Sequence, residues 1–197
     1  MRAKLQAQKE ELSQAVQRIQ ILATRDELTG LYNRRHMMDV LNQHQKRLSR
    51  SGHHRFCLAI LDIDHFKRIN DSHGHGVGDE VLRGFAQVAE SVLRDTDVLA
   101  RWGGEEFLVL LNDTQATQAN VGLERLRELL DKTTLVPGLP ELKPTFSAGL
   151  TAYELSEPLH TCIERADQAL YRAKTGGRNR TEIAQQIDAK AVVAHAS

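Results

Sequence analysis

Apolar residues recur along the chain with two kinds of spacing, which predict helices in some segments and strands in others. Intervals of three and four residues put apolar side chains on one side of a helix. This spacing predicts helices over residues 34–50, 80–94, 114–132 and 159–174. Short apolar runs predict strands over residues 56–64, on both sides of a turn within 99–111, and over 144–153. Prolines and a glycine predict a surface loop over residues 134–143.

The first 25 residues have a different pattern from the rest of the chain. They are polar and rich in glutamine, and Leu5, Leu12 and Ile19 are spaced by seven, with Ala15 and Leu22 in the partner positions. This heptad pattern predicts a parallel two-stranded coiled coil, and therefore a homodimer. The alternative is a single helix lying on the surface of the domain. We also expect a sensory domain to precede this helix in a longer receptor.

Segment 99–111 is predicted to form a β-hairpin with acidic residues at its tip. Gly103 and Gly104 form the expected two-residue turn, because glycine adopts the required backbone angles without strain. Glu105 and Glu106 would then follow in the strand, where alternation directs their side chains to opposite faces. One carboxylate would thus face a ligand. The alternative is a charged tip that only keeps the hairpin soluble.

A second predicted strand also ends in acidic residues. The apolar run from Phe56 suits a strand buried on both faces, and it finishes with Asp62 and Asp64 on one face. Carboxylates at the ends of adjacent strands are suitable ligands for Mg²⁺, which takes its remaining oxygens from water and phosphates. The two acidic strand ends therefore indicate a site that handles nucleoside triphosphates.

Composition and charge limit the classes of partner and the cellular compartment that we expect for this protein. The 197 residues allow one domain of ordinary size and an appendage. The 26 basic residues equal the 26 acidic ones, so the positive field typical of proteins that bind nucleic acid is missing. Cys57 and Cys162 lie in apolar segments, where reduced core thiols are more common than a disulfide. No apolar run reaches the roughly 20 residues of a membrane span, so we expect a cytoplasmic protein without membrane contact in this sequence.

Glycines alternate with other residues between positions 73 and 79, a composition that predicts a loop. Their spacing differs from the dinucleotide-binding fingerprint, and no Lys-Ser/Thr pair follows as in a P-loop. The histidines at 65, 73 and 75 suggest a zinc site, but no cysteine or further histidine stands at ligand spacing. The segment alone therefore identifies no ligand.

Several separate motifs resemble those of the GGDEF family of diguanylate cyclases, over about residues 26–179. They are Asp-x-Leu-Thr-Gly-Leu-x-Asn-Arg-Arg from Asp26, Asp-Ile-Asp-His-Phe-Lys-Arg-Ile-Asn-Asp from Asp62, Gly-Gly-Glu-Glu-Phe from Gly103, and Ala-Asp-x-Ala-Leu-Tyr-x-Ala-Lys-x-x-Gly-Arg-Asn from Ala166. The resemblance implies condensation of two GTP molecules into cyclic di-GMP with release of pyrophosphate. It also implies an α/β fold with a central, mainly antiparallel sheet flanked by helices, similar to the palm-type core of nucleotidyl cyclases.

The resemblance further implies a metal site and a guanine site. Two divalent cations per active site, Mg²⁺ or alternatively Mn²⁺, would be held by Asp62, the backbone carbonyl of Ile63, Glu105 and Glu106. We expect Glu105 to be the more central ligand and a candidate base for the attacking hydroxyl.

Asn70 and Asp79 would recognise the guanine edge, because an amide and a carboxylate match its donors and acceptor. The alternative for Asp79 is a helix N-cap for residues 80–94. The further GTP-binding residues implied are His65, Phe66, Lys67, Gly103, Gly104, Lys174 and Arg178. Without the resemblance, Lys67 would be a solvated charge, and the last two cations would complement a helix dipole.

An inhibitory site for the product is implied by Arg94 and Asp97, which match the family's Arg-x-x-Asp motif. Arg125, on the next predicted helix, is a possible helper. The alternative for the first two residues is an exposed ion pair between positions three apart.

We therefore expect a coiled-coil helix over residues 1–25, a cyclase domain over 26–182 and a flexible tail over 183–197. Two domains must meet face to face, because the product has two-fold symmetry and one domain binds one GTP. The alternatives are a catalytically silent receptor for GTP or cyclic di-GMP, a cyclase or polymerase for another nucleotide, and a structural coiled-coil module. The intact acidic residues disfavour the first, the guanine-binding pair disfavours the second, and the third leaves the acidic strand ends unexplained.

Overall fold

The computed structural model describes residues 2–51, 55–155 and 157–185. In chain order the elements are α1 (Arg2–Thr24), β1 (Tyr32–Asn33), α2 (Arg34–Ser51), β2 (Phe56–Ile63), α3 (Phe66–His73), α4 (His75–Val92), β3 (Val98–Gly103), β4 (Glu106–Asn112), α5 (Ala116–Lys132), β5 (Phe146–Ala152), α6 (Leu159–Thr175) and β6 (Thr181–Ile183). The predicted helices and strands are therefore confirmed, apart from the start of α4. The sequence pattern missed α3 and the short strands at the two ends of the sheet.

Six strands of the described part form one sheet in the order β1-β3-β4-β2-β5-β6. The three central pairings, β3 with β4, β4 with β2 and β2 with β5, are antiparallel. The edge strands β1 and β6 run parallel to their neighbours. The expected mainly antiparallel sheet is thus confirmed, with β2 near its centre.

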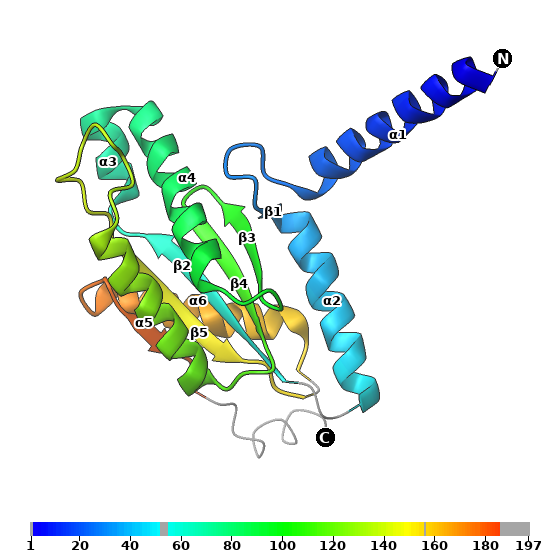
Figure 1. Cartoon of the computed structure of the whole chain (residues 1–197). Coiled ribbons are helices and arrows are strands. Elements are labelled where there is room, and N and C mark those ends of the chain that lie inside the picture. The colour runs from blue at the N-terminus through cyan, green and yellow to red at the C-terminus, as the bar shows by residue number, and fades with distance from the viewer. Residues whose placement is uncertain (1, 52–54, 156, 186–197) are drawn as a thin grey trace.

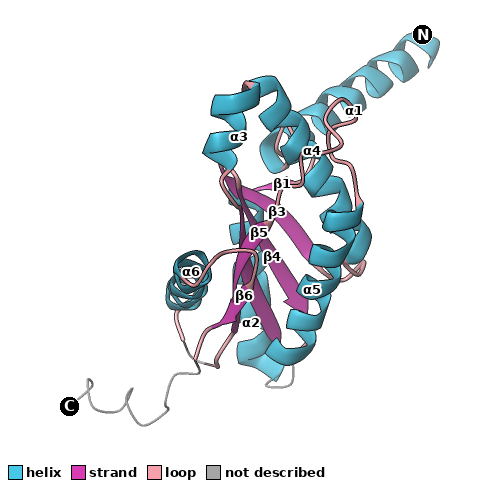
Figure 2. Ribbon diagram, turned by 90° about the vertical axis from the view of Figure 1, so that its left-hand side faces the viewer, coloured by secondary structure: helices cyan, strands magenta, loops and turns pink. Residues whose placement is uncertain are grey.

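Helices cover both faces of the sheet (Figures 1 and 2). Helices α4 and α5 lie on one face, while α2 and α6 lie on the other. Alternation along β2 gives Leu61 and Ile63 to the first core and Leu58 and Ile60 to the second, so both faces of this strand are buried. By the same alternation, Asp62 projects toward the face that α6 covers.

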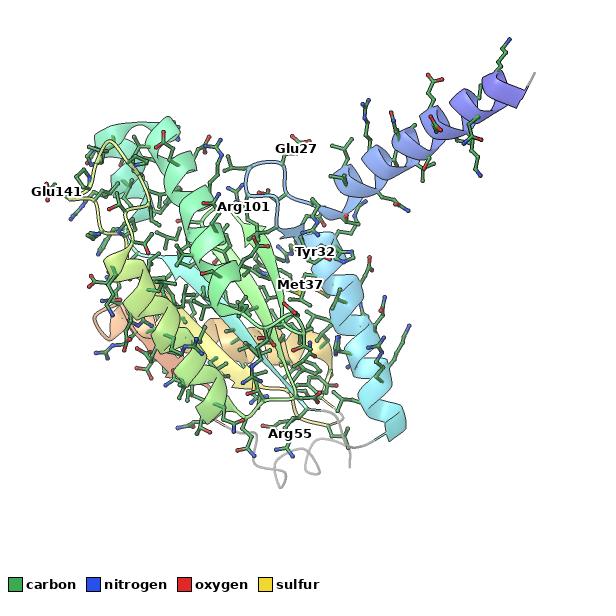
Figure 3. The ribbon with its side chains drawn as sticks, in the orientation of Figure 1. Glu27, Tyr32, Met37, Arg55, Arg101 and Glu141 are labelled. Carbon is green, nitrogen blue, oxygen red and sulfur yellow. The ribbon has the colours of Figure 1, made fainter. Side chains whose placement is uncertain are left out.

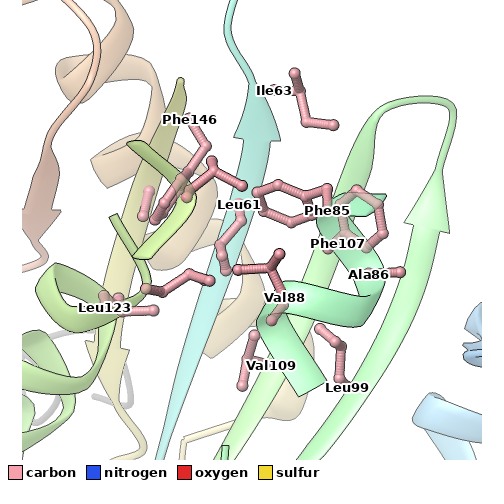
Figure 4. Packing of buried hydrophobic residues seen from close by; sticks show 14 of the residues in the cluster. Leu61, Ile63, Phe85, Ala86, Val88, Leu99, Phe107, Val109, Leu123 and Phe146 are labelled. Carbon is pink, nitrogen blue, oxygen red and sulfur yellow. The ribbon is translucent and has the colours of Figure 1, made fainter. Parts of the chain in front are cut away.

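The core beneath α4 contains a group of aromatic rings (Figure 4). The ring centroid of Phe85 lies 4.7 Å from that of Phe107 and 5.6 Å from that of Phe146. Leu135 and Val136 are also buried there, although residues 134–143 were expected to form a surface loop. The loop turns inward because Gly84 of α4 leaves room, since a Cβ at that position would lie 3.1 Å from the Leu135 side chain.

Helix α1 extends away from the domain (Figure 1). Its apolar residues Leu12, Ile19 and Leu22 are each more than 60% exposed, so the alternative of a helix lying on the domain is wrong. The side chain of Leu5, the first residue of the predicted seam, lies outside the described part. The coiled coil itself stays a prediction. Within the described residues, no helix is both long and apolar enough to cross a membrane.

A tight joint connects α1 to the domain. The carboxylate of Asp26 accepts hydrogen bonds from the backbone N–H of Thr29 at 2.9 Å and from its hydroxyl at 2.7 Å. Asn33 Oδ1 accepts from the backbone N–H of His36 at 2.9 Å, so the predicted N-cap of α2 is confirmed. The amide of Asn33 also donates to the Ala23 carbonyl at 3.0 Å, which ties the end of α1 to the start of α2.

The last strand continues past the expected domain boundary at residue 182. Strand β6 ends at Ile183, and the N–H of the buried Ala184 donates to the Leu150 carbonyl at 2.7 Å. Residues 186–197 of the predicted tail lie outside the described part. The division into three segments stays a prediction.

Candidate functional site

Acidic residues of two neighbouring strands meet at one end of the sheet. Asp62 of β2 lies opposite Glu106 of β4 in the strand register, and the N–H of Ile63 donates to the Glu105 carbonyl at 3.3 Å. Asp62 is 7% exposed, while both glutamates are partly exposed. We call Asp62, Glu105 and Glu106 the acidic edge.

The hairpin turn is displaced by one residue from its expected position. Gly103 pairs with Glu106, so Gly104 and Glu105 are the central residues, and Gly104 has a φ of +46°. The expectation that Glu105 follows the turn in a regular strand is therefore wrong. The reason is a register shift at Trp102, where β3 bulges and the pairing moves by one position.

The carboxylates of the acidic edge strongly influence each other. Burial raises the pKa of Asp62, and the charges of Glu105 and Asp64 add to this, whereas a hydrogen bond and the charge of Lys174 lower it. Burial also raises the pKa of Glu106, with the charge of Asp62 as the next contribution. Lys174 Nζ lies 2.7 Å from Asp62 Oδ2, so a lysine expected at the triphosphate is paired with a predicted metal ligand.

The donor set of the acidic edge fits a divalent cation. Buried carboxylates that repel one another are stabilised by added positive charge, and hard oxygen ligands suit Mg²⁺. Among the described residues, no group of three His, Cys, Asp or Glu side chains is already gathered around one point. Asp62 Oδ2 is paired with Lys174 instead, so a cation at this oxygen would require that contact to open.

Asp64 does not belong to this edge, although it shares a strand face with Asp62 by sequence. Its carboxylate accepts hydrogen bonds from Thr145 Oγ1 at 2.7 Å and Ser147 Oγ at 2.6 Å. The backbone N–H of Asn179 is a third donor, at 3.0 Å. These contacts occupy the carboxylate, and Asp64 is 4% exposed.

The predicted guanine-binding residues lie on α3 and α4, which follow β2 directly. The side-chain oxygen Oδ1 of Asn70 is buried and has no hydrogen-bond partner among the described residues. Gly78 packs against this amide so closely that a Cβ there would lie 3.0 Å from Asn70 Cγ and closer still to Oδ1. A buried polar atom without a partner is costly, and a ligand N–H would satisfy it.

Asp79 adjoins Gly78, and its alternative role as a helix N-cap is wrong. Helix α4 begins at His75, four residues earlier, and Gly74 occupies the cap position without a side-chain hydrogen bond. The glycines at 76 and 78 suggested a loop by composition, but both lie within the helix. Asp79 is partly exposed on the second turn of α4.

The other residues expected at GTP are distributed around these two groups. His65 precedes α3 with a φ of +58°, Phe66 is buried near Gly78, and Lys67 is exposed. Gly103 and Gly104 are exposed at the hairpin turn. Arg178 is exposed beyond α6, with a φ of +63°.

Arg94, Asp97 and Arg125 line one pocket between the end of α4 and α5, as expected for residues of a common site. The alternative ion pair of Arg94 with Asp97 is wrong, because in the described part no guanidinium nitrogen of Arg94 lies within 4 Å of an Asp97 carboxylate oxygen. Instead, Asp97 Oδ2 accepts from the Arg94 N–H and Oδ1 from the Asn112 N–H, each at 3.1 Å. The carboxylate thus fixes the backbone around the pocket.

Arg101, which was not predicted from the sequence, links the joint after α1 to the hairpin (Figure 3). Its Nη1 lies 3.2 Å from Asp26 Oδ1, and its Nε and Nη2 donate to the Gly104 carbonyl at 2.9 and 2.8 Å. Burial acts to raise the pKa of Asp26, but hydrogen bonds from Thr29 and the charge of Arg101 outweigh it and the pKa is lowered. The only sequence indication was an arginine two residues before the glycines.

The sequence matches one protein family over most of its length. The family profile described as "Diguanylate cyclase, GGDEF domain" matches residues 23–180. Diguanylate cyclase DgcP of Pseudomonas aeruginosa is 48% identical over 162 residues, which cover 82% of this chain and 24% of that protein. The chain therefore spans about a quarter of the length of that relative. The probable diguanylate cyclase DgcC of Escherichia coli is 40% identical over 176 residues, which cover 88% of this chain and 46% of that protein.

A solved structure has the same arrangement of a helix and a domain. The coiled coil and GGDEF domain of DgcB from Caulobacter crescentus, in complex with c-di-GMP, superimposes with a TM-score of 0.83 at 34% identity. The superposition covers 92% of this chain and 96% of that one. The fold is thus shared over nearly the whole chain.

Proposed function

Since the chain belongs to the GGDEF family, we propose that it is a diguanylate cyclase, which condenses two GTP molecules into cyclic di-GMP and releases pyrophosphate. The observation that carries the proposal is the acidic edge of Asp62, Glu105 and Glu106 at the same end of the sheet as the buried, unsatisfied Asn70 oxygen. The acidic edge can hold the cations that bind phosphates, and the Asn70 oxygen can accept a hydrogen bond from an N–H of a base. Together they suit a nucleotide whose base carries such an N–H.

Guanine selection would depend on Asn70 and Asp79. The Asn70 Oδ1 accepts a hydrogen bond from the base, and its NH₂ donates one to the guanine carbonyl. The Asp79 carboxylate accepts from the ring N–H and the exocyclic amine, a donor pair that adenine lacks. The cations Lys67, Lys174 and Arg178 would bind the triphosphate.

In each step the 3′-hydroxyl oxygen of one GTP would attack the α-phosphorus of the other. The bond from that phosphorus to the bridging oxygen breaks, pyrophosphate leaves, and the hydroxyl proton passes to a base, for which Glu105 is our candidate. Asp62, Glu105, Glu106 and the Ile63 carbonyl would hold two Mg²⁺ or Mn²⁺ ions, which when bound stabilise phosphoryl charge and activate the hydroxyl. Lys174 would leave Asp62 for the leaving phosphates.

The test is incubation of nucleotide-free protein with GTP and Mg²⁺, followed by chromatography and mass measurement of the products. We expect cyclic di-GMP and pyrophosphate from the parent and none from Glu105→Ala. The rival is a silent receptor for GTP or cyclic di-GMP. Binding of GTP without any product, even from concentrated protein, would support that receptor and refute the cyclase.

We further propose that the chain acts as a homodimer held by α1. One domain binds one GTP, so a two-fold symmetric product needs two domains. The exposed Leu12, Ile19 and Leu22 are suited to a coiled-coil seam, and such a seam raises the effective concentration of the domains toward the millimolar range. Deletion of residues 1–24 should therefore lower specific activity at dilute protein. An unchanged specific activity would contradict this role.

Product feedback is proposed for the pocket of Arg94, Asp97 and Arg125. Arginines suit the phosphates of cyclic di-GMP and stack on its bases, while the carboxylate can accept from guanine. We expect Arg94→Ala to resist inhibition by added cyclic di-GMP. Arg94 is the better position to change, because Asp97 also holds two backbone N–H groups. Equal inhibition of variant and parent would exclude this site.

A cytoplasmic location follows from the proposed substrate and agrees with the thiols. Cys57 and Cys162 are free and buried, and burial raises the pKa of the Cys57 thiol to about 11. Reduced, unreactive thiols of this kind are typical of a reducing compartment, where GTP is also found.

A further inference from the structure

The segment between α6 and β6 holds two residues in an unusual backbone conformation. Arg178 has a φ of +63° and Asn179 a φ of +46°, so both lie in the left-handed region although each carries a Cβ. This region is sterically unfavourable for such residues, and asparagine tolerates it better than arginine does. The segment keeps this conformation only if surrounding contacts hold it.

Asn179 is held from two sides. Its backbone N–H donates to Asp64 Oδ2 at 3.0 Å, and its side-chain Oδ1 accepts from Arg127 Nη1 at 2.9 Å. Asp64 directly follows β2, and Arg127 lies on α5, so elements far apart in sequence meet at one residue. We call Asp64, Arg127 and Asn179 the Asn179 clamp.

Both partners of this asparagine are themselves fixed. Asp64 is 4% exposed and accepts from Thr145 Oγ1 at 2.7 Å and Ser147 Oγ at 2.6 Å. Arg127 Nη1 donates to the Phe146 carbonyl at 2.6 Å, and its guanidinium carbon lies 4.4 Å from the centre of the Phe146 ring. Because side chains with this many partners have little freedom, the clamp is a rigid support.

The clamp stands next to the acidic edge. Asp64 is two residues from Asp62, and Arg178 directly precedes Asn179. Arg178 also lies four residues beyond Lys174, whose ammonium contacts Asp62 at 2.7 Å. The clamp fixes the residue that directly follows Arg178, and the Arg178 N–H donates to the Ala173 carbonyl of α6 at 2.9 Å, so the backbone from which the Arg178 side chain leaves is held on both sides.

We propose that Asp64 and Arg127 are positioning residues for triphosphate binding. Through Asn179 they maintain the left-handed backbone from which Arg178 reaches the phosphates, and neither of them touches the nucleotide. This inference depends on the proposed function, which assigns Arg178 to the triphosphate. It explains why a buried carboxylate next to the acidic edge is fully occupied by protein donors.

The test compares the affinities of the full chain for GTP and for GMP, in buffer with EDTA so that no GTP is consumed. GMP has the guanine but lacks the β- and γ-phosphates. We expect Asn179→Ala and Arg127→Lys each to weaken GTP binding about tenfold, the effect of one hydrogen bond to a charged group, with little change for GMP. Asn179→Gly should lose less than Asn179→Ala, because glycine accepts a positive φ. Arg180→Ala, an exposed cation outside the clamp, is the matched control.

Combination with Arg178→Ala separates the inference from the proposed function. In that background, Asn179→Ala should have no additional effect on GTP affinity. If Arg178→Ala leaves the ratio of GTP to GMP affinity unchanged, its assignment to the phosphates is wrong. If it lowers this ratio but the clamp variants do not, or if they weaken both nucleotides equally, the clamp is only structural and the inference is overturned.

Discussion

Gly78→Ala tests the guanine site through one added methyl group. The new Cβ would lie 3.0 Å from Asn70 Cγ and 3.2 Å from Phe66 Cζ, and closest of all to Asn70 Oδ1. Ordinary contacts begin near 3.4 Å, so the Asn70 amide must rotate or move away. Its buried oxygen then no longer accepts from guanine, and the base loses its partner. The loss of one such hydrogen bond costs about 1–3 kcal/mol, which corresponds to about 5- to 150-fold weaker GTP binding.

Gly76→Ala is a matched control for this substitution. It lies on the same helical turn of α4, and a Cβ there meets no heavy atom within 4 Å. Replacing glycine by alanine within a helix favours the helix by about 0.5–1 kcal/mol, so the unfolding temperature of the control variant should not fall. Calorimetric titration with GTP would be compared for the two variants and the parent. Equal affinities for all three would refute the assignment of Asn70 to the guanine edge.

Three further predictions concern the fold and the acidic edge. Gly149→Ala should destabilise the domain by about 3 kcal/mol or more in urea unfolding, because its Cβ would meet backbone atoms of α6, including Leu170 Cα at 2.9 Å. Gly122→Ala is the control, because a Cβ there has open space around it and should not destabilise the domain. Similar losses of stability in both variants would contradict the close approach of Gly149 to α6. Burial raises the pKa of Glu106, so this carboxyl stabilises the metal-free protein at low pH and loses that contribution as the pH rises through the folded pKa. Glu106→Gln should therefore raise the melting temperature at pH 8 but not near pH 4, and a gain independent of pH would exclude this cause. Arg101→Ala should lower kcat more than it lowers GTP affinity, because Arg101 supports the hairpin turn that carries Glu105 and does not contact the guanine-binding pair; equal losses in kcat and affinity would argue against that division.

Periodicity was sufficient where the local pattern and the tertiary environment agree. Helix α6 was expected over residues 159–174 and runs from Leu159 to Thr175. Strand β2 was recognisable from its continuous apolar run, because it is covered on both faces. The N-cap Asn33 was also predictable, since a single side chain determines the start of α2.

Prediction failed where a distant contact decides the local conformation. The glycines at 76 and 78 favour a loop by composition, yet both lie in helix α4, and position 78 needs a glycine because the Asn70 side chain leaves no room for a Cβ. The turn at Gly104 is displaced because β3 bulges at Trp102, which depends on the pairing of two strands. No local pattern reports either contact.

The candidate site was predictable mainly through its motifs. They led to the carboxylates of the acidic edge and to Asn70, but the partners that fix the site were not visible. Arg101 contacts Asp26, which lies 75 residues away in the sequence. Asp64 and Arg127 both contact Asn179, across 115 and 52 residues. Such pairs have no periodicity to reveal them.

The two edges of the sheet differ from its interior in a way that affects association. Strand β1 has two residues and β6 has three, so little backbone is available there for strand addition by another chain. Within the described residues, two copies brought together by the proposed stalk therefore have no long edge strand through which to merge their sheets. In the proposed dimer, the short edge strands oppose a lasting fusion of the two sheets, even at the high local concentration that the proposed stalk would create.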